Sequence, residues 1–457
     1  MIDPDDLGRT TKIDLDDGSA ATIAEAMARA SARRLCISLG AGWSDSAGAT
    51  AAALTAIRCG TRAFGGGVIV VSKDDPVVRL GWGRGMPLAD ILRGAGAHRM
   101  DRVPADTPLV VSIAGGVSGD GVRTLHATWE GWAGGVVGAS DARLAEDDAN
   151  RLAGVVAGAI AVSESFQAAK GNVVASRRDA GLSLWKPGVD WRDPDARGPS
   201  LAYLPTSLWL LGLGHLGQAN AWALGWLPYP AESGALVGLV DADRVIPANI
   251  DTGLLLLPGD VRRPKARTVA RELETLGLGT LVSERRFGPH FTPSAQEPSI
   301  ALAGFDSPGP RRVLESVGFT HVVDAGLGSA RQYLDIVVWT FPGSSRAADV
   351  FPDAPGSADF DPRTIPAYAT AMAELEASGQ SPEAAACGVS ELAGRTAGAA
   401  FVGAIAGCLS VADILRDLHN GPRIEAISLS LSDPGFVRLA DNPVAPPPNR
   451  GFVRVRG

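Results

Sequence analysis

A glycine turn that follows an apolar strand constrains this 457-residue chain more than any other feature. Ser207 to Leu211 is a short apolar run, and Gly212-x-Gly214-x-x-Gly217 comes at its end. The small residues from Gln218 to Gly225 then predict a helix. In such a unit the glycines let the backbone approach a phosphate, and the helix directs free N–H groups at the anion. The turn therefore indicates a nucleotide-binding α/β unit.

The residues after the turn decide the interpretation, because glycine triplets also arise by chance in a chain with 56 glycines. A second apolar strand, Ala235 to Val240, ends in Asp241-Ala-Asp243, where a carboxylate can accept hydrogen bonds from a ribose. The later polar positions that complete the set are Asn249, Lys265, Asp306, Arg311 and Arg312.

This set resembles the ThiF/MoeB/E1-like family, whose members use ATP to adenylate the carboxy-terminus of ubiquitin-like proteins or small peptides. The spacing from Asp243 through Asn249 to Lys265 keeps the family register without a gap. The resemblance implies ATP and Mg²⁺ as ligands and adenylation as the activity. By position, Gly212, Gly214, Gly217, Asn249 and Lys265 would face the phosphates, Asp241 and Asp243 the ribose side, and Asp306 would hold Mg²⁺.

One position departs from the family pattern, because Thr252 stands where the family has an arginine. Threonine cannot neutralise charge on a leaving pyrophosphate. Either another arginine supplies that charge or the activity is impaired. Arg58 and Arg62 are candidates, since paired E1-like assemblies often contribute an arginine across an interface. The carboxyl end of a helix also favours cations, which would explain the same two residues without a catalytic role.

The first half, residues 1–185, also alternates helix-like and strand-like segments. Its runs Leu35–Leu39, Gly67–Val71 and Leu109–Ile113 are typical of buried parallel strands. Small-residue helices are predicted at Asn150–Ala169 and Gly394–Leu415, one in each half. The first half is therefore either a second α/β domain of its own or a diverged copy that lacks the nucleotide site.

The fold class is α/β, with a Rossmann-like, mostly parallel sheet expected in an adenylation domain at residues 207–457. A polar segment at 186–206 is predicted to be a linker that docks through Trp185 and Trp191. Residues 342–382 are rich in Pro, Gly, Ser and Asp and are predicted to form a loop. In the E1-like family this region crosses over the bound substrate tail.

Some members of the family carry a thioester cysteine near that crossover, and Cys387 is the nearest cysteine here. A thiolate at Cys387 could take the acyl group from the adenylate, but the pattern favours a small buried thiol before a helix. The other cysteines are Cys36, Cys59 and Cys408, and no C-x-x-C pair occurs. Free thiols in a reducing compartment are therefore expected.

Charge and hydropathy restrict the partners. A net charge of −8 argues against nonspecific binding to nucleic acid or to an anionic membrane. No run of 18 apolar residues and no apolar signal core at the acidic N-terminus are found, so we expect a cytoplasmic protein. The resemblance implies a ubiquitin-like or peptide carboxy-terminus as substrate, an acyl-accepting partner protein, and the family's homodimer or two halves that mimic it.

Two other functions stay open. A catalytically degenerate E1-like scaffold or regulator would keep the fold, and Thr252 favours it. A nicotinamide-dependent oxidoreductase could use the same glycine turn, but it gives no role to Asn249 or Lys265.

Overall fold

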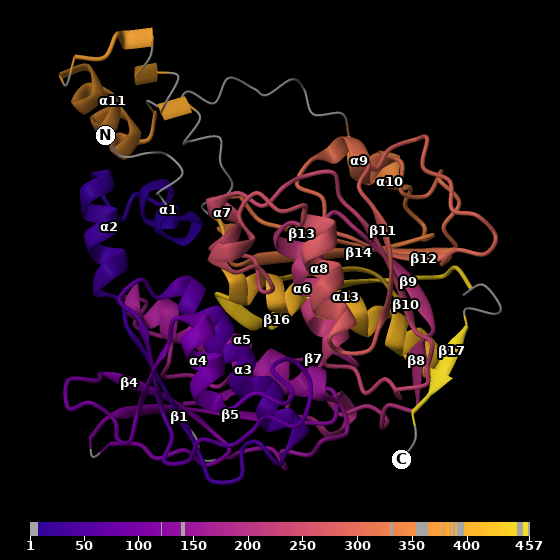
Figure 1. The fold of residues 1–457 in the computed structure, drawn as a ribbon, viewed down its shortest axis with the longest axis horizontal. Coiled ribbons are helices and arrows are strands. Elements are labelled where there is room, and N and C mark those ends of the chain that lie inside the picture. The colour runs from indigo at the N-terminus through magenta and orange to yellow at the C-terminus, as the bar shows by residue number, and fades with distance from the viewer. Residues whose placement is uncertain are drawn as a thin grey trace.

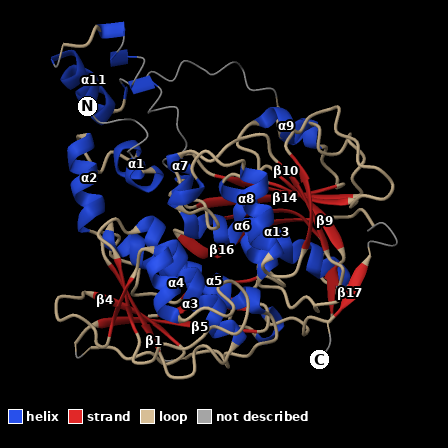
Figure 2. Cartoon of the chain, viewed as in Figure 1, coloured by secondary structure: helices blue, strands red, loops and turns tan. Residues whose placement is uncertain are grey.

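The computed structural model describes residues 8–119, 121–138, 142–329, 332–352, 364–377, 379–383, 385–386, 389–390, 397–445 and 451–455. Two sheets dominate the described chain, one in each half (Figure 1). The strands form two separate groups, and long helices gather between them (Figure 2). The α/β fold class expected from the sequence is confirmed.

The first sheet has seven strands in the order β3-β2-β1-β4-β5-β6-β7. Neighbouring strands are parallel as far as β5 and antiparallel after it. The strands are β1 (Leu35–Leu39), β2 (Val68–Val71), β3 (His98–Met100), β4 (Leu109–Ile113), β5 (Arg123–Glu130), β6 (Ala133–Val137) and β7 (Ala180–Ser183). The helices are α3 (Ala47–Ala63), α4 (Leu88–Ala95) and α5 (Arg151–Ala169).

The second sheet has eight strands in the order β11-β10-β9-β12-β13-β14-β15-β16. The strands are β9 (Ser207–Leu211), β10 (Leu236–Val240), β11 (Gly279–Ser283), β12 (Ile300–Ala303), β13 (His321–Leu327), β14 (Asp335–Phe341), β15 (Ile424–Ser430) and β16 (Asp433–Asp441). The helices are α6 (His215–Gly225), α7 (Pro247–Ile250), α8 (Lys265–Glu274), α9 (Pro308–Arg312), α10 (Ala347–Val350) and α13 (Ala400–Leu418).

The two sheets repeat one topology. Counted within each half, the strand order is 3-2-1-4-5-6-7 in both, and the second half adds one further strand at the edge. In the second half, too, the pairs are parallel up to the fifth strand and antiparallel beyond it. The long helices α5 and α13 each precede the seventh strand. This match supports the interpretation of the first half as a diverged copy of the second.

Helices α5 and α13 are the closing helices of the two halves. Each carries a G-x-x-x-G pair that permits close packing. A Cβ at Gly158 of α5 would lie 2.3 Å from the carbonyl oxygen of Ala52 in α3, and one at Gly407 of α13 would lie 2.5 Å from that of Ala219 in α6. Only glycine fits such contacts. The two closing helices also meet each other, with the Phe166 and Phe401 rings 5.6 Å apart.

Helix α5 has the length and hydropathy of a membrane span. In the described structure, however, 89% of its 18-residue window is buried, which is the environment of a core helix. Its core position results from packing against α3 on one side and α13 on the other.

The segment between the halves is docked, as predicted. Trp191 is buried in a small cluster with Ala133 and Val137, and the Trp185 ring lies 5.1 Å from the Trp132 ring. The segment includes η2 (Pro194–Ala196) and β8 (Tyr203–Pro205), and β8 pairs with β17 (Phe452–Arg454) near the end of the chain.

A small helical cluster lies apart from the sheets and joins distant parts of the chain (Figure 1). It is formed by α1 (Arg9–Asp16), α2 (Ile23–Ala32) and α11 (Pro366–Ala377). Tyr368 is buried against Leu15, and its hydroxyl donates to Asp16 at 2.5 Å. The prediction of a loop throughout 342–382 is therefore wrong for α10 and α11, because burial against helices from the chain start stabilises α11.

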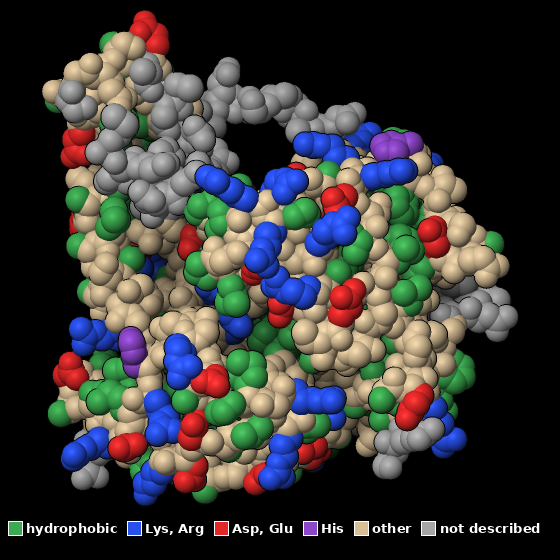
Figure 3. All heavy atoms as spheres, viewed as in Figure 1, with side chains coloured by type: hydrophobic (Ala, Val, Ile, Leu, Met, Phe, Trp, Pro, Cys, Tyr) green, Lys and Arg blue, Asp and Glu red, His purple; other side chains and the backbone are tan. Residues whose placement is uncertain are grey.

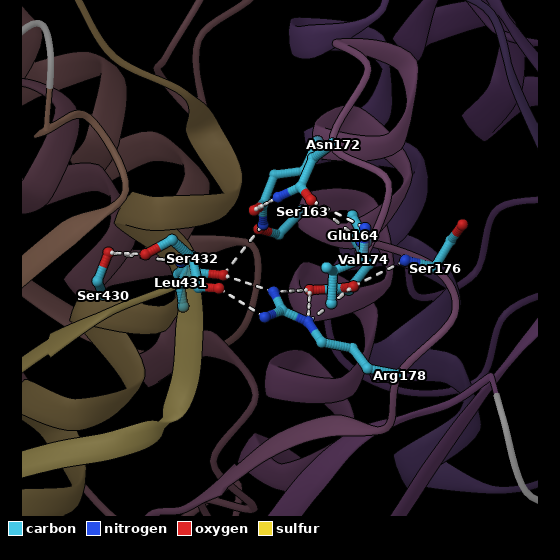
Figure 4. Close-up of polar contacts among 11 residues, drawn as sticks. Ser163, Glu164, Asn172, Val174, Ser176, Arg178, Ser430, Leu431 and Ser432 are labelled. Carbon is cyan, nitrogen blue, oxygen red and sulfur yellow. Dashed lines mark hydrogen bonds and ion pairs between the residues drawn. The ribbon is translucent and has the colours of Figure 1, made fainter.

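Polar contacts also cross between the halves (Figure 4). Arg178 pairs with the buried Glu164 of α5, and its Nη1 donates to the carbonyl of Ser432 at 2.5 Å. Gln167 of α5 donates to the carbonyl of Leu431 at 3.0 Å. These contacts hold the β15–β16 turn of the second half against the first.

Candidate nucleotide-binding site

The glycine turn lies between β9 and α6. Gly212 has a left-handed φ of 78°, and a Cβ at Gly217 would lie 1.8 Å from the carbonyl oxygen of Gly212. These two positions therefore need glycine. Gly214 precedes the first turn of α6 and provides no capping side chain. Among the described residues no side chain caps the N-terminus of α6, so its first N–H groups and its positive dipole end face the position that an anion would take.

Asp241 braces the turn from the end of β10. Its Oδ2 accepts from the Leu213 N–H at 2.7 Å, and its Oδ1 accepts from the Asp243 N–H at 2.7 Å. Burial raises the pKa of Asp241, and the two N–H donors and Lys265 partly offset this effect. A carboxylate oxygen has two lone pairs, so Asp241 can brace the turn and still accept from a ribose hydroxyl.

Lys265 lies beside this carboxylate pair at the start of α8. Its Nζ is 3.2 Å from Asp243 Oδ2, and the lysine side chain is only 10% exposed. Lys and Arg side chains gather on the surface over α8 and α9 (Figure 3). The ion pair with Asp243 holds the ammonium group of Lys265 at the carboxyl edge of the sheet, where nucleotides bind in folds of this kind.

Asp306 reaches the same edge from β12. The preceding Gly304 packs on α6, since a Cβ there would lie 2.7 Å from Leu216 Cβ, and Phe305 lies against Gly212. Asp306 itself is exposed and has no hydrogen bond or ion pair with another described residue. An exposed carboxylate at this position fits the oxygen-ligand preference of Mg²⁺.

Asn249 and Gln218 shape the floor of the site. Asn249 is buried, and its Oδ1 accepts from the Ile246 N–H at 3.1 Å. Gln218, which the sequence interpretation passed over, bridges the Leu213 carbonyl at 3.1 Å and the Leu255 N–H at 3.2 Å. A buried polar residue directly after Gly217 was the signal for its role.

Arginines of the first half reach the segment that follows Thr252. Thr252 is 1% exposed, and Arg62 of α3 donates through Nη2 to the Leu256 carbonyl at 2.6 Å. Arg62 Nε and Arg58 Nη1 are buried without a hydrogen-bond partner in the described structure. Burial, followed by the charge of Arg58, lowers the pKa of Arg62 to about 10. The structure thus brings Arg62, the sequence-based candidate, to the segment that follows Thr252.

His215 packs between the glycine turn and α13. A Cβ at Gly403 would lie 2.3 Å from His215 Nε2, which is buried without a partner in the described structure. Burial and the charge of Arg9 lower the pKa of His215 to about 3. The ring is therefore neutral and belongs to the α6–α13 contact.

Asp324, a further carboxylate of this sheet, lies fully buried at β13. Arg311 Nε donates to its Oδ2 at 2.9 Å, and the Arg311 guanidinium stacks 3.9 Å from the Phe351 ring. Burial raises the pKa of Asp324 to about 6 despite this pairing. The ion pair with Arg311 gives Asp324 a structural role.

Three cysteines are unsuited to nucleophilic chemistry. Cys36, Cys59 and Cys408 are buried, and burial raises the pKa of each thiol, to about 11 in Cys36. Cys387, the candidate acyl acceptor, lies outside the described residues.

A glycine turn after β9, carboxylates at two strand ends and a strand order that both halves repeat are features expected of an E1-like protein. The chain belongs to the BilD family of bacterial E1-like proteins. Family models match at residues 34–184, the BilD N-terminal domain, and 204–421, the BilD C-terminal domain. The chain is 37% identical over 461 residues to the bacterial E1-like protein BilD of Collimonas sp. (strain OK412), covering 99% of this chain and 97% of that one.

Solved structures give weaker likenesses. E. coli MccB is 15% identical, with a TM-score of 0.34 over 53% of this chain and 63% of that one. E. coli tRNA N6-threonylcarbamoyladenosine dehydratase, TcdA, in complex with ATP is 22% identical, with a TM-score of 0.21 over 24% and 45%. With TM-scores below 0.5, neither structure adds weight to the assignment made from the chain itself.

Proposed function

We propose that this E1-like protein uses ATP to adenylate the carboxy-terminus of a ubiquitin-like protein or peptide. The observation that supports the proposal is the open N-terminus of α6, with Asp241, Lys265 and Asp306 around it at one sheet edge. Each of these groups has the charge that a nucleotide triphosphate with a divalent cation requires.

The chain's residues would act mainly by positioning. The N–H groups of the glycine turn and Lys265 would hold the phosphates, and Asp241 would orient the ribose. A substrate carboxylate oxygen attacks the α-phosphorus as its bond to pyrophosphate breaks, which gives an acyl-adenylate and pyrophosphate. Asp306 would hold Mg²⁺, which would supply neutralisation of the phosphate charge. Arg62 would add the cation that Thr252 lacks, and such a group is typically worth about 10²–10³ in rate.

A thiol is the expected next acceptor of the acyl group. Because Cys36, Cys59 and Cys408 are buried with raised pKa values, Cys387 is the cysteine left for this role. The bond between the acyl group and AMP would break as the thioester forms, and AMP would leave.

Calorimetric titration of the full chain with ATP and Mg²⁺ tests the proposal first. Lys265→Ala and Asp306→Ala should lose nucleotide binding, whereas Lys186→Ala should retain it. Lys186 is a matched control, since it also pairs with an aspartate, Asp195, at 3.1 Å. Folded wild-type protein that binds no ATP would contradict the proposal, and stabilisation by NAD instead would favour the oxidoreductase.

Pyrophosphate exchange distinguishes an active adenylating enzyme from a catalytically degenerate scaffold, the alternative that Thr252 favours. With the correct carboxylate substrate, Arg62→Ala should reduce exchange about 10²-fold while ATP still binds. Arg29→Ala, an exposed arginine paired with Glu25 on α2, should leave exchange unchanged. ATP binding without exchange for candidate ubiquitin-like and peptide substrates would instead support a scaffold.

A further inference from the structure

The first half contains a counterpart of the nucleotide turn. Gly40-x-Gly42 follows β1, as Gly212-x-Gly214 follows β9, although the connection from Gly42 to α3, which begins at Ala47, is four residues longer than that from Gly214 to α6, which begins at His215. The N-terminus of α3, however, is already occupied by a carboxylate. Asp148 accepts from the Ser46 hydroxyl at 2.8 Å, from the Ala47 N–H at 3.0 Å and from the Gly48 N–H at 2.7 Å.

The glycine contacts of the closing helices establish which residues correspond. Gly158 meets Ala52 in the first half, and Gly407 meets Ala219 in the second. Counting back four residues on the first helices pairs Gly48 with His215. Counting back ten residues from Gly158 and from Gly407, to just before each closing helix, pairs Asp148 with Ala397. The N–H donors that bind Asp148 therefore correspond to those of Gly214 and His215.

The correspondence assigns Ala397, which has no acceptor side chain, to the place that Asp148 takes at α3. A Cβ on the adjacent Gly398 would lie 3.5 Å from His215 Nδ1, so this segment lies against the side chain of the first residue of α6. Ala397 is 4% exposed. This position is therefore a carboxylate, Asp148, in the half whose helix α3 is capped. It is a methyl group, Ala397, in the half of helix α6.

We propose that the residue at this position determines whether each half can bind a phosphate. In the first half the Asp148 carboxylate takes the place of a phosphate oxygen, using the N–H donors and repelling a second anion. In the second half Ala397 supplies no acceptor, and no described side chain caps α6 in its place, so Ala397 is a specificity-determining residue of the nucleotide site. The chain then binds one nucleotide, in its second half. The assignment of Ala397 rests on the proposed function.

Stoichiometry and two complementary variants test this inference. Calorimetry of the full chain with ATP and Mg²⁺ should give one site. Ala397→Asp should weaken ATP binding by about 100-fold or more, because the new carboxylate competes for charged hydrogen bonds. Ala397→Ser is the matched control for added size and should bind close to wild type. Two sites in wild type, or normal binding by folded Ala397→Asp protein, would overturn the inference.

The first half is tested separately with Asp148→Ala, which should open the α3 N-terminus. At saturating ATP and Mg²⁺, inorganic phosphate should raise the melting temperature of Asp148→Ala protein but not that of wild type. An equal effect of phosphate on the melting temperatures of Asp148→Ala and wild-type protein would overturn the role of Asp148. This experiment also tests the inference if Ala397→Asp protein does not fold. Absence of ATP binding in wild type would contradict the proposed function, whereas phosphate stabilisation of Asp148→Ala protein would still support the Asp148 assignment.

Discussion

Arg416 of α13 donates from Nη1 to the carbonyl oxygen of Leu184, 2.8 Å away in the first half of the chain. Leu431 is the counterpart of Leu184, because each follows the seventh strand of its half and its carbonyl accepts from the opposite half. The boundary between the halves is thus pseudo-symmetric, and its contacts are made by the closing helices.

Replacing Arg416 should strongly destabilise this boundary. Its guanidinium is fully buried and pairs with Asp413 at 2.6 Å, so Arg416→Met leaves a buried carboxylate with less compensation. We expect a loss of about 3–5 kcal/mol, read from urea denaturation. Arg423→Met is the control: that side chain is 25% exposed, 3.5 Å from Asp417, and should cost less than about 1 kcal/mol. Equal losses would refute the argument.

A glycine exchange in α13 tests the close helix packing. Gly407→Ala should destabilise the protein by about 1–3 kcal/mol, since the added methyl meets the Ala219 backbone at 2.5 Å. Gly94→Ala in α4 is the matched control, because no atom lies within 4 Å of its Cβ position. This change should stabilise by about 0.4–1 kcal/mol through the unfolded state. A neutral Gly407→Ala variant in thermal unfolding would contradict the packing geometry.

Protonation of His215 should couple folding to pH. The pKa of His215 falls from its ordinary 6.5 to about 3 in the fold, so between these pH values the unfolded chain binds a proton that the folded chain does not. Stability should therefore decrease as pH falls from 6.5 toward 3, by at most about 1.4 kcal/mol per pH unit from this group.

A variant isolates this effect. His215→Gln should flatten the dependence of unfolding free energy on pH in that range, whereas His98→Gln, at an exposed histidine on β3, should not. If both variants keep the wild-type slope, His215 is not the titrating group.

Thiol reactivity should divide the cysteines. Cys36, Cys59 and Cys408 are buried with raised pKa values, so iodoacetamide at neutral pH should modify them only after denaturation. Mass spectrometry of native, labelled protein locates the modified residues. Cys387→Ser should abolish thioester formation but retain pyrophosphate exchange. Rapid native labelling of Cys59 or Cys408 would show that the core is more open than the packing indicates.

Local patterns explain how much of the site the sequence could predict. The glycine turn, Asp241 and Asp306 follow strand ends, and the ends of parallel strands meet at one edge, so their proximity was predictable. Lys265 begins α8 instead, and its place at this edge was expected only from the family spacing. Arg62 reaches its position only because the two halves pack together. The contact of Asp148 with α3 joins residues about 100 positions apart and leaves no local signal.

Tertiary burial also explains the incorrect loop prediction for residues 342–382. The polar and Pro-rich composition of that range is typical of a loop, yet α11 forms where Tyr368 and Ala371 meet an apolar surface from the chain start. Local propensity carries no information about a partner surface more than 300 residues away. The patterns of small and apolar residues in α5 and α13, by contrast, did predict both helices. Each helix is buried around nearly its whole circumference, so the requirement for small and apolar residues appears along its entire sequence.

The cluster of α1, α2 and α11 has a consequence for biosynthesis. Leu15, Ala20 and Ala26 leave the ribosome more than 300 residues before Ile365, Tyr368 and Val389, which cover them. Throughout that interval of synthesis this apolar surface is uncovered and available to chaperones or to aggregation. A nascent chain stalled before residue 365 would still expose it, so completion of this cluster marks a chain that has been translated beyond both sheets' parallel strands.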